Sequence, residues 1–131
     1  MITEDRIADI LRRLNEAENA RVHSTVEETM ARIDEIMAPD VEGWRNGVHY
    51  PNREAEREIE RKSFGSLVDY NRTFQHVLIA PPKACIAWTI RGTFGGKQIA
   101  APGCSIFEFN DEGRAIRYWM FFNPADFAYR A

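Results

Sequence analysis

The side chains of this 131-residue chain best suited by type to proton transfer are a histidine and a late carboxylate. His49 lies within residues 40–52, where Gly and Pro punctuate the chain and predict a rim loop. An imidazole exchanges protons near neutral pH, so His49 is a candidate acid or base. Asp126 is a second candidate if the chain end folds over a pocket. For His49, a solvent-exposed loop position is the alternative.

Two further candidates are uncharged. Ser105 and Asn123 lie in apolar, strand-like segments, where a hydroxyl or an amide can donate a hydrogen bond to a developing enolate oxygen. Their alternative role is that of buried polar groups bonded to neighbouring backbone. Arg45 offers a bidentate fork for a ligand carboxylate or phosphate, with a surface salt bridge as its alternative. The candidate catalytic residues are therefore His49, Ser105, Asn123 and Asp126.

The sequence lacks the spacings of several well-defined sites. It contains no Ser-His-Asp arrangement, nucleophile elbow or phosphate loop, and residues 92–96 predict a hairpin turn rather than a nucleotide cradle. His23, His49 and His76 are too scattered to bring ligands to one metal ion. We therefore expect neither a metal nor a cofactor.

Composition narrows the class of protein. A hydrophobic share of 44% with 28% charged residues is ordinary for a globular domain, and we expect a single domain spanning residues 1–131. The net charge of −3 offers no positive field for nucleic acid. No signal-peptide pattern opens the chain and no apolar stretch approaches the roughly 20 residues that span a bilayer, so we expect a cytoplasmic protein without membrane contact. Cys85 and Cys104 are expected to be reduced core thiols, with a disulfide as the alternative.

The first half of the chain predicts three helices. Residues 4–19 carry apolar side chains at helical spacing after Thr3, a candidate N-cap. A second helix begins at Ser24 or Thr25, where Thr25 and Glu28 match a capping box, and its apolar spacing continues to Met37. A third opens at Asn52.

The third helix starts with a charged run, residues 53–62, whose alternating signs predict a solvated face. Its later turns are expected to bring four apolar side chains inward. These are Ile59, Phe64, Leu67 and Val68.

From residue 71 onward the hydrophobic period changes to two, which predicts strands. Candidate strands cover residues 72–80, 83–94, 97–109 and 114–123. Clusters of Pro, Gly, Asn and Asp between them predict tight turns and hence a four-stranded meander. Helices followed by strands indicate an α+β fold.

Several segments resemble one known family. They are residues 84–96 (ACIAWTIRGTFGG), residues 103–116 (GCSIFEFNDEGRAI), Tyr118-Trp119 and residues 52–55 (NREA). These resemble SnoaL-like polyketide cyclases and ketosteroid isomerase of the nuclear transport factor 2-like superfamily. The resemblance implies a cone-shaped half-barrel, with three N-terminal helices packed on a curved, mostly antiparallel sheet around an apolar pocket. It also implies a small hydrophobic molecule as the ligand and a homodimer formed through the outer sheet face.

Alternation along the strands then selects pocket residues, because side chains two apart share a face. The resemblance places the face of Trp88 inside and, by the same rule, the faces of Ser105 and Trp119. The alternative for the aromatic side chains is that they only fill the core. The predicted ligand contacts are Trp44, Arg45, Ile86, Trp88, Ile90, Ala101, Gly103, Phe107, Trp119 and Phe121.

The sequence departs from its relatives at the positions of their carboxylates. Where ketosteroid isomerase carries an aspartate base and a protonated acid, this chain has Arg45 or Trp44, and Ser105. Where the SnoaL-like cyclases carry an acidic residue after the tryptophan of the last strand, it has Asn123. An amide cannot act as a general base.

Three functions stay open at this point. The first is a cofactor-independent isomerase, cyclase or dehydratase acting on a hydrophobic cyclic or polyketide-like carbonyl compound. The second is a non-catalytic ligand-binding module of the same fold. The third is a dimeric interaction module without a ligand, which requires four aromatic side chains to fill the pocket: Trp88, Phe107, Trp119 and Phe121.

Overall fold

A computed structural model describes residues 1–127 of the chain as three α-helices, two short 3₁₀ helices and one six-stranded sheet. Within this range no helix combines the length and the apolar character needed to cross a membrane. The elements in chain order are α1 (Glu4–Asn19), η1 (Ala20–His23), α2 (Val26–Asp34), β1 (Met37–Arg45), β2 (Val48–Tyr50), α3 (Arg53–Ser63), β3 (Val68–Ala80), β4 (Lys83–Phe94), β5 (Lys97–Phe109), β6 (Ala115–Phe122) and η2 (Pro124–Phe127).

Each α-helix begins after a residue whose side chain caps it. The side chains of Thr3, Thr25 and Asn52 accept hydrogen bonds from backbone N–H groups three residues further on, at 3.2, 3.1 and 2.9 Å. These bonds satisfy amides that the first helical turn leaves without partners. The three helix starts predicted from the sequence are confirmed.

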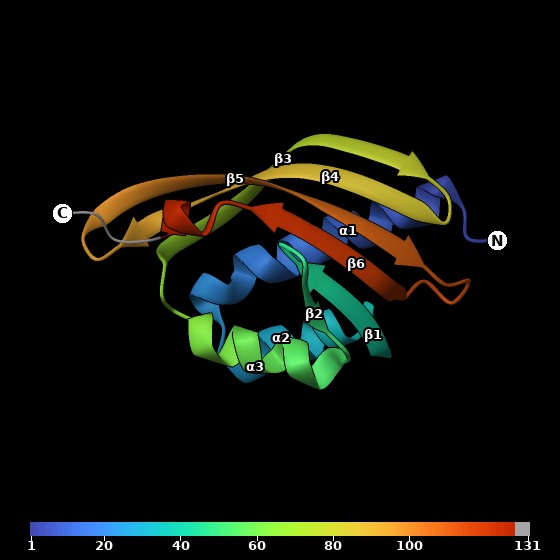
Figure 1. Ribbon diagram of the computed structural model, residues 1–131, viewed down its shortest axis with the longest axis horizontal. Coiled ribbons are helices and arrows are strands. Elements are labelled where there is room, and N and C mark those ends of the chain that lie inside the picture. The colour runs from blue at the N-terminus through green and yellow to red at the C-terminus, as the bar shows by residue number, and fades with distance from the viewer. Residues whose placement is uncertain (128–131) are drawn as a thin grey trace.

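The sheet is curved and mixed, with the strand order β2-β1-β6-β5-β4-β3. Strands β3 to β6 form an antiparallel meander, and β1 joins it by pairing in parallel with β6. Figure 1 shows α1, α2 and α3 on the same side of the sheet, which bends over them. The predicted α+β fold, with helices packed on a curved and mostly antiparallel sheet, is confirmed.

The segment after α2 differs from the prediction. The helix ends at Asp34, and Met37 opens strand β1 rather than continuing the helix. Ala115 donates its N–H to the carbonyl oxygen of Ile36 at 2.7 Å and pairs in register with Met37. Most of the predicted rim loop is thus a β1–β2 hairpin. The pairing partner lies at the far end of the chain, so local spacing could not reveal it.

Helix α3 also ends earlier than predicted. It stops at Ser63, and Gly65 two residues later has a positive φ of 79°, a conformation that glycine adopts without steric cost. Val68 therefore opens strand β3 and is 62% exposed, so its predicted inward position is wrong. Leu67, between the two elements, lines the cavity described below.

The core fills the space between α1 and the sheet. Trp88, the largest fully buried side chain, donates its indole N–H to Ser105 Oγ at 2.9 Å. It lies against Gly103 on the next strand, where an added Cβ would overlap the ring, and Tyr118 covers Gly43 in the same way. Other members of the core are Ile7, Ile10, Leu11, Leu14, Ile33, Met37, Val41, Ile86, Phe107 and Phe109.

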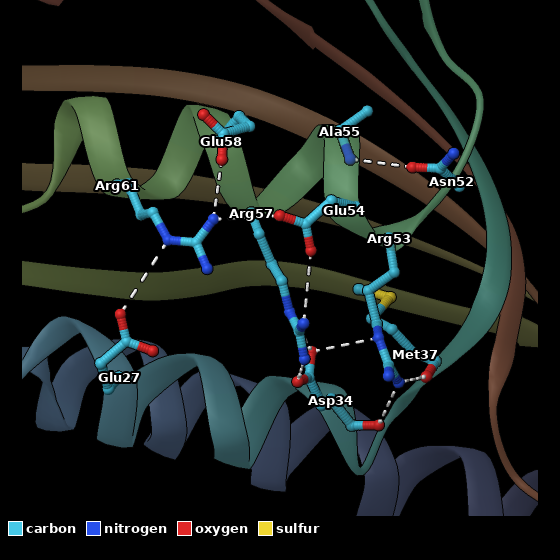
Figure 2. Close-up of polar contacts among 10 residues, drawn as sticks. All are labelled: Glu27, Asp34, Met37, Asn52, Arg53, Glu54, Ala55, Arg57, Glu58 and Arg61. Atoms are coloured by element: carbon cyan, nitrogen blue, oxygen red, sulfur yellow. Dashed lines mark hydrogen bonds and ion pairs between the residues drawn. The ribbon is translucent and has the colours of Figure 1, made fainter.

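Charged side chains dock α3 against α2. Asp34, at the end of α2, pairs with Arg57 and lies 3.4 Å from Nε of Arg53 (Figure 2). Arg61, further along α3, reaches Glu27 at 3.9 Å. With this face of α3 held to α2, another face of the helix is turned toward the sheet.

The two cysteines lie on the sheet face that the helices leave uncovered. Cys85 alternates along β4 with the buried Ala84 and Ile86, and its sulfur is 3.4 Å from that of Cys104. Both thiols are free and half-buried. The expectation of reduced thiols agrees with the structure, but their predicted position in the core is wrong.

Candidate functional site

A cavity of about 320 Å³ lies between α3, the end of α1 and the inner face of the sheet. Phe127 of η2 lies edge-on to Phe122 with ring centroids 5.5 Å apart, so the last described residues fold over this cavity. Its apolar side chains are Ile59, Leu67, Trp88, Ile90, Met120, Phe122, Pro124 and Phe127, and its polar ones are Glu18, Arg21, Arg45, Glu60, Ser63, Ser66, Tyr70 and Arg72.

The inner face of α3 contributes buried carboxylates. Glu56, Ile59 and Glu60 share one face of the helix because residues three and four apart are neighbours. The side chains of Glu56 and Glu60 are only 13% and 15% exposed. The predicted solvated face is correct for Glu54 and Glu58, at 61% and 56%, and wrong for these two glutamates.

Arg21 links two of the buried carboxylates. Its guanidinium pairs with Glu18, from the end of α1, and lies 3.3 Å from Oε2 of Glu60 on α3. The guanidinium carbon is also 4.2 Å from the ring centroid of Tyr70. Two carboxylates thus share one cation at the cavity wall, which leaves one negative charge without compensation from Arg21.

The surroundings of Glu60 favour its protonated form. Burial first, and the negative charge of Glu18 second, raise the pKa of Glu60 to about 7 against the opposing charges of Arg21 and Arg45. A carboxyl group with a pKa near neutrality can both accept and release a proton. Glu60 is therefore the residue of this wall best suited to proton transfer.

Arg45 and Glu56 form a second buried ion pair, with Nη2 and Oε1 3.1 Å apart. Arg45 also donates from Nε to the Tyr118 hydroxyl at 3.4 Å. Burial opposes the charge on Arg45, but Glu56 and Tyr118 outweigh it and raise the pKa of this guanidinium. For Glu56, burial raises the pKa and the positive charge of Arg45 only partly opposes this effect. Arg45, a predicted ligand contact, lines the cavity as a paired cation.

Tyr70 and Arg72 bring strand β3 into the wall. They share one face of the strand and are 7% and 6% exposed. Burial first, and the charge of Glu18 second, raise the pKa of the Tyr70 phenol, which therefore keeps its proton and remains a donor. Among residues 1–127, no three His, Cys, Asp or Glu side chains are grouped closely enough to hold a metal ion.

Comparison with protein families gives a match to the SnoaL-like domain over residues 11–118. This chain belongs to the SnoaL-like domain family. No curated protein matches it.

Solved structures share the fold of this SnoaL-like domain. TsrD from Streptomyces laurentii has a TM-score of 0.78 at 15% identity, covering 96% of this chain and 94% of its own. A protein assigned as a SnoaL-like polyketide cyclase from Jannaschia sp. CCS1 has a TM-score of 0.76 at 15% identity, covering 92% and 87%. An LEH-like epoxide hydrolase of M. tuberculosis has a TM-score of 0.72 at 14% identity, covering 94% and 86%. At such identities the likeness shows the fold alone.

In this SnoaL-like domain, the residues of β4 and β5 that were predicted to face the pocket lie on the sheet face that the helices cover. Trp88 and Ile90 line the cavity, and their role in ligand binding stays a prediction. Ser105 is 1% exposed and its hydroxyl accepts the indole N–H of Trp88, so it lies in the core rather than in the cavity wall. The covered set is Ile86, Trp88, Ile90, Ala101, Gly103, Ser105 and Phe107.

Strand β6 presents its other face to the cavity. Met120 and Phe122 line the cavity and Tyr118 is buried, whereas Phe121 is 50% exposed on the outer face with Trp119. The predicted inward orientation of Trp119 and Phe121 is wrong. Both faces of this strand carry large apolar side chains, so alternation alone does not select the inner one. A register shift where β5 meets the start of β6 sets the phase.

The remaining candidates do not line the cavity. His49 is exposed and stacks on Trp44 with ring centroids 5.0 Å apart, and its Nε2 lies 3.0 Å from Oε2 of Glu42. Asn123 is exposed and its side-chain oxygen accepts a backbone N–H at the start of η2, at 3.0 Å. Asp126 lies in η2, where other residues form the wall. The structure therefore does not bring His49, Asn123 and Asp126 together.

Apart from Arg45, the charged groups in and behind the cavity wall were not predicted from the sequence. Glu56 and Glu60 lie in a run of alternating charges, which predicted a solvated helix face for both. One signal was present: both lie beside Ile59, the first large apolar residue of α3, and so fall on the face that a helix buries. No sequence pattern indicates that Glu18 and Arg21 meet this helix.

Proposed function

We propose that this SnoaL-like domain catalyses cofactor-independent proton transfer on a small, hydrophobic carbonyl compound, as an isomerase, cyclase or dehydratase. The observation that carries the proposal is the Glu60 carboxylate in the cavity wall, 3.3 Å from a guanidinium that it shares with Glu18. Carboxylates held in different surroundings at one site commonly divide acid and base roles. One similar structure is assigned as a polyketide cyclase, which supports a polyketide-like compound.

In the proposed reaction, ionised Glu60 removes a proton from the carbon next to the carbonyl group. The C–H electron pair forms a C=C bond, and the carbonyl π electrons move to the oxygen, to which Tyr70 donates a hydrogen bond. Protonated Glu60 returns the proton to another carbon, which completes an isomerisation. If the enolate carbon instead attacks a second carbonyl group, a ring closes and the new alkoxide takes the proton.

The size and wall of the cavity support a ligand of one or two rings. Its volume of about 320 Å³ is at the lower end of ligand pockets, which span roughly 300–1,000 Å³. Trp88, Ile90 and Phe122 offer apolar surface for the ring, while the charged groups come from α1, η1, β1, α3 and β3. Exclusion of water by the ring strengthens every electrostatic interaction around Glu60.

Exchange of α-protons tests the proposal without a known substrate. Steroids, cyclic ketones, lactones and aromatic polyketides are incubated with the protein in D₂O, and loss of the α-proton signals is followed by NMR. The wild-type protein is expected to accelerate exchange for at least one compound. Glu60→Gln keeps the size of the side chain and should slow that exchange about 100-fold or more.

Matched variants separate this role from a general effect of charge. Glu58→Gln removes a carboxylate that is 56% exposed on the same helix and should exchange at the wild-type rate. His49→Ala and Asn123→Ala, which lie outside the cavity wall, should do the same. Exchange that stays fast in Glu60→Gln would show that another group transfers the proton.

Binding without turnover is the second candidate function. It is favoured by the residues at the predicted positions of the ketosteroid isomerase carboxylates, which are Arg45 or Trp44, and Ser105. Arg45 is paired with Glu56 and Ser105 is bonded to Trp88. A compound that raises the melting temperature while its α-protons exchange at the uncatalysed rate would support this function over catalysis.

A further inference from the structure

Arg72 holds a buried guanidinium at the cavity wall. Its side chain is anchored by α1, because Nε donates to Oδ1 of Asn15 at 2.9 Å. Its backbone is anchored by Asn19, which accepts the N–H at 2.7 Å and donates to the carbonyl oxygen at 2.9 Å. The guanidinium carbon is 5.3 Å from the ring centroid of Phe74. The side chain is thus fixed in place on the sheet side of the cavity.

One nitrogen of this guanidinium has no partner. Nη2 of Arg72 is buried and makes no hydrogen bond within the described part of the chain. A buried donor that stays unpaired carries a desolvation cost that a partner would remove. Since Arg72 is only 6% exposed and lines the cavity, an acceptor on a bound molecule can supply that partner.

No carboxylate in the described part of the chain forms an ion pair with Arg72. Arg21 and Arg45 each pair with a buried glutamate, at 3.3 Å for Glu60 and 3.1 Å for Glu56. Within residues 1–127, no acidic oxygen lies within 4.0 Å of the Arg72 guanidinium. A buried charge without a partner is costly, and a guanidinium matches the two oxygens of a carboxylate.

We infer that the ligand of this cavity carries one carboxylate, which Arg72 binds, on a hydrophobic body. This inference rests on the proposed function, since it makes the substrate an acidic carbonyl compound with its reacting carbon toward α3 and its carboxylate toward β3. A single negative charge suits one unpaired guanidinium. A phosphate, which carries about two charges near neutral pH, would add a second charge close to Glu18 and Glu60.

Two pairs of probes isolate the contribution of charge. Naphthoate is compared with naphthamide, and cyclohexanecarboxylate with cyclohexanecarboxamide, by isothermal titration calorimetry. Within each pair the ring is the same and only the acid carries a charge. For at least one pair, the wild-type protein should bind the carboxylate about 10-fold or more tightly than the amide.

Substitution of Arg72 locates the anion site. Arg72→Gln should abolish the preference for the carboxylate and leave the affinity for the amide unchanged, while Arg72→Lys should retain part of the preference. The matched control is Arg91→Gln, which removes an exposed arginine from strand β4. If Arg72→Gln does not fold, the NMR signal of the Arg72 Nε–H group in the wild-type protein, identified by its absence in Arg72→Lys, should shift on addition of naphthoate.

The outcomes distinguish this inference from the proposed function. Equal affinity for acid and amide in both pairs, or undiminished carboxylate preference in Arg72→Gln, overturns the anion site whatever the exchange experiment shows. Glu60→Gln should still bind naphthoate, because it removes a negative charge from the wall. Arg72-dependent binding together with unchanged exchange in Glu60→Gln would leave the anion site standing and remove the proposed catalytic role.

Discussion

At the residue scale, Arg21 lies between two glutamates and only partly offsets the effects that raise the pKa of Glu60. The guanidinium pairs with Glu18 and lies 3.3 Å from Glu60, so the second carboxylate is only partly compensated. Burial and the charge of Glu18 then raise the pKa of Glu60 to about 7. Tyr70, packed against the same guanidinium, keeps its proton for the same two reasons. Burial and the charge of Glu18 thus favour both a candidate general base, Glu60, and a hydrogen-bond donor, Tyr70.

The pKa of Glu60 predicts a pH dependence of stability. Because this pKa is higher in the folded protein than the ordinary 4.5, the folded state binds the proton more tightly, and the contribution to the unfolding free energy is lost as the pH rises from 4.5 to about 7. Glu60→Gln removes this titration. The unfolding free energy of the variant, taken relative to that of the wild-type protein, should therefore rise by about 1–3 kcal/mol from acidic to alkaline pH.

Urea unfolding of both proteins at about pH 5 and about pH 8.5 measures this difference. Glu58→Gln, which is exposed on the same helix, is the control and should follow the wild-type protein at both values. Parallel pH profiles for Glu60→Gln and wild type would contradict the raised pKa.

At the scale of elements, α3 separates its charges between two surfaces. Arg53 and Arg57 hold the helix to Asp34 of α2 (Figure 2), whereas Glu56 is buried against Arg45 and Glu60 lines the cavity. In the sheet, a glycine makes room for a large side chain of the neighbouring strand. Gly103 on β5 leaves room for the ring of Trp88, which a Cβ at this position would overlap.

Gly103→Ala tests this packing of β4 on β5. The new methyl group would overlap the Trp88 ring, and overpacking of this kind costs about 1–3 kcal/mol. Trp88→Phe shortens the ring and should recover part of that loss when the two changes are combined. Unfolding free energies of the wild-type, single and double variants give the coupling. Additivity within about 0.5 kcal/mol would show that the two residues do not interact in this way.

At the scale of the whole molecule, the outer sheet face carries a continuous row of side chains. The row crosses all six strands in register and consists mainly of apolar and aromatic groups. Trp44 and Trp119 stack within it with ring centroids 5.4 Å apart, and Phe121 lies beside it at 50% exposure. Its members are Leu78, Cys85, Ile106, Trp119, Trp44 and His49.

We expect this outer face to form the homodimer that the family resemblance implies. Phe121→Lys places a charge in the expected interface and should convert the dimer to a monomer, because a buried unpaired charge opposes association. Sedimentation equilibrium measures the mass of both proteins. Val22→Lys, an exposed apolar position on η1 at 45%, is the control and should remain dimeric. A monomeric wild-type protein, or a dimeric Phe121→Lys, would contradict the prediction.

Much of the candidate site could not be predicted because its parts come from separate elements. The apolar wall was partly foreseen, since alternation along β4 correctly turned Trp88 and Ile90 inward. Among the charged side chains of the wall, only Arg45 was predicted. Glu18 and Arg21 are near neighbours in sequence, but their meeting with Glu60 depends on how α1 and α3 pack beneath the sheet.

The sequence by itself determined the helix starts at Thr3, Thr25 and Asn52, and the limits of strands β4 and β5, because caps, turns and alternation act over a few residues. Only the tertiary structure decided which face of β6 is covered, where α2 ends, and which carboxylates face the cavity. These features depend on contacts between distant segments. The proton affinity of Glu60 depends on them most directly, because burial and neighbouring charge, rather than residue type, set its pKa.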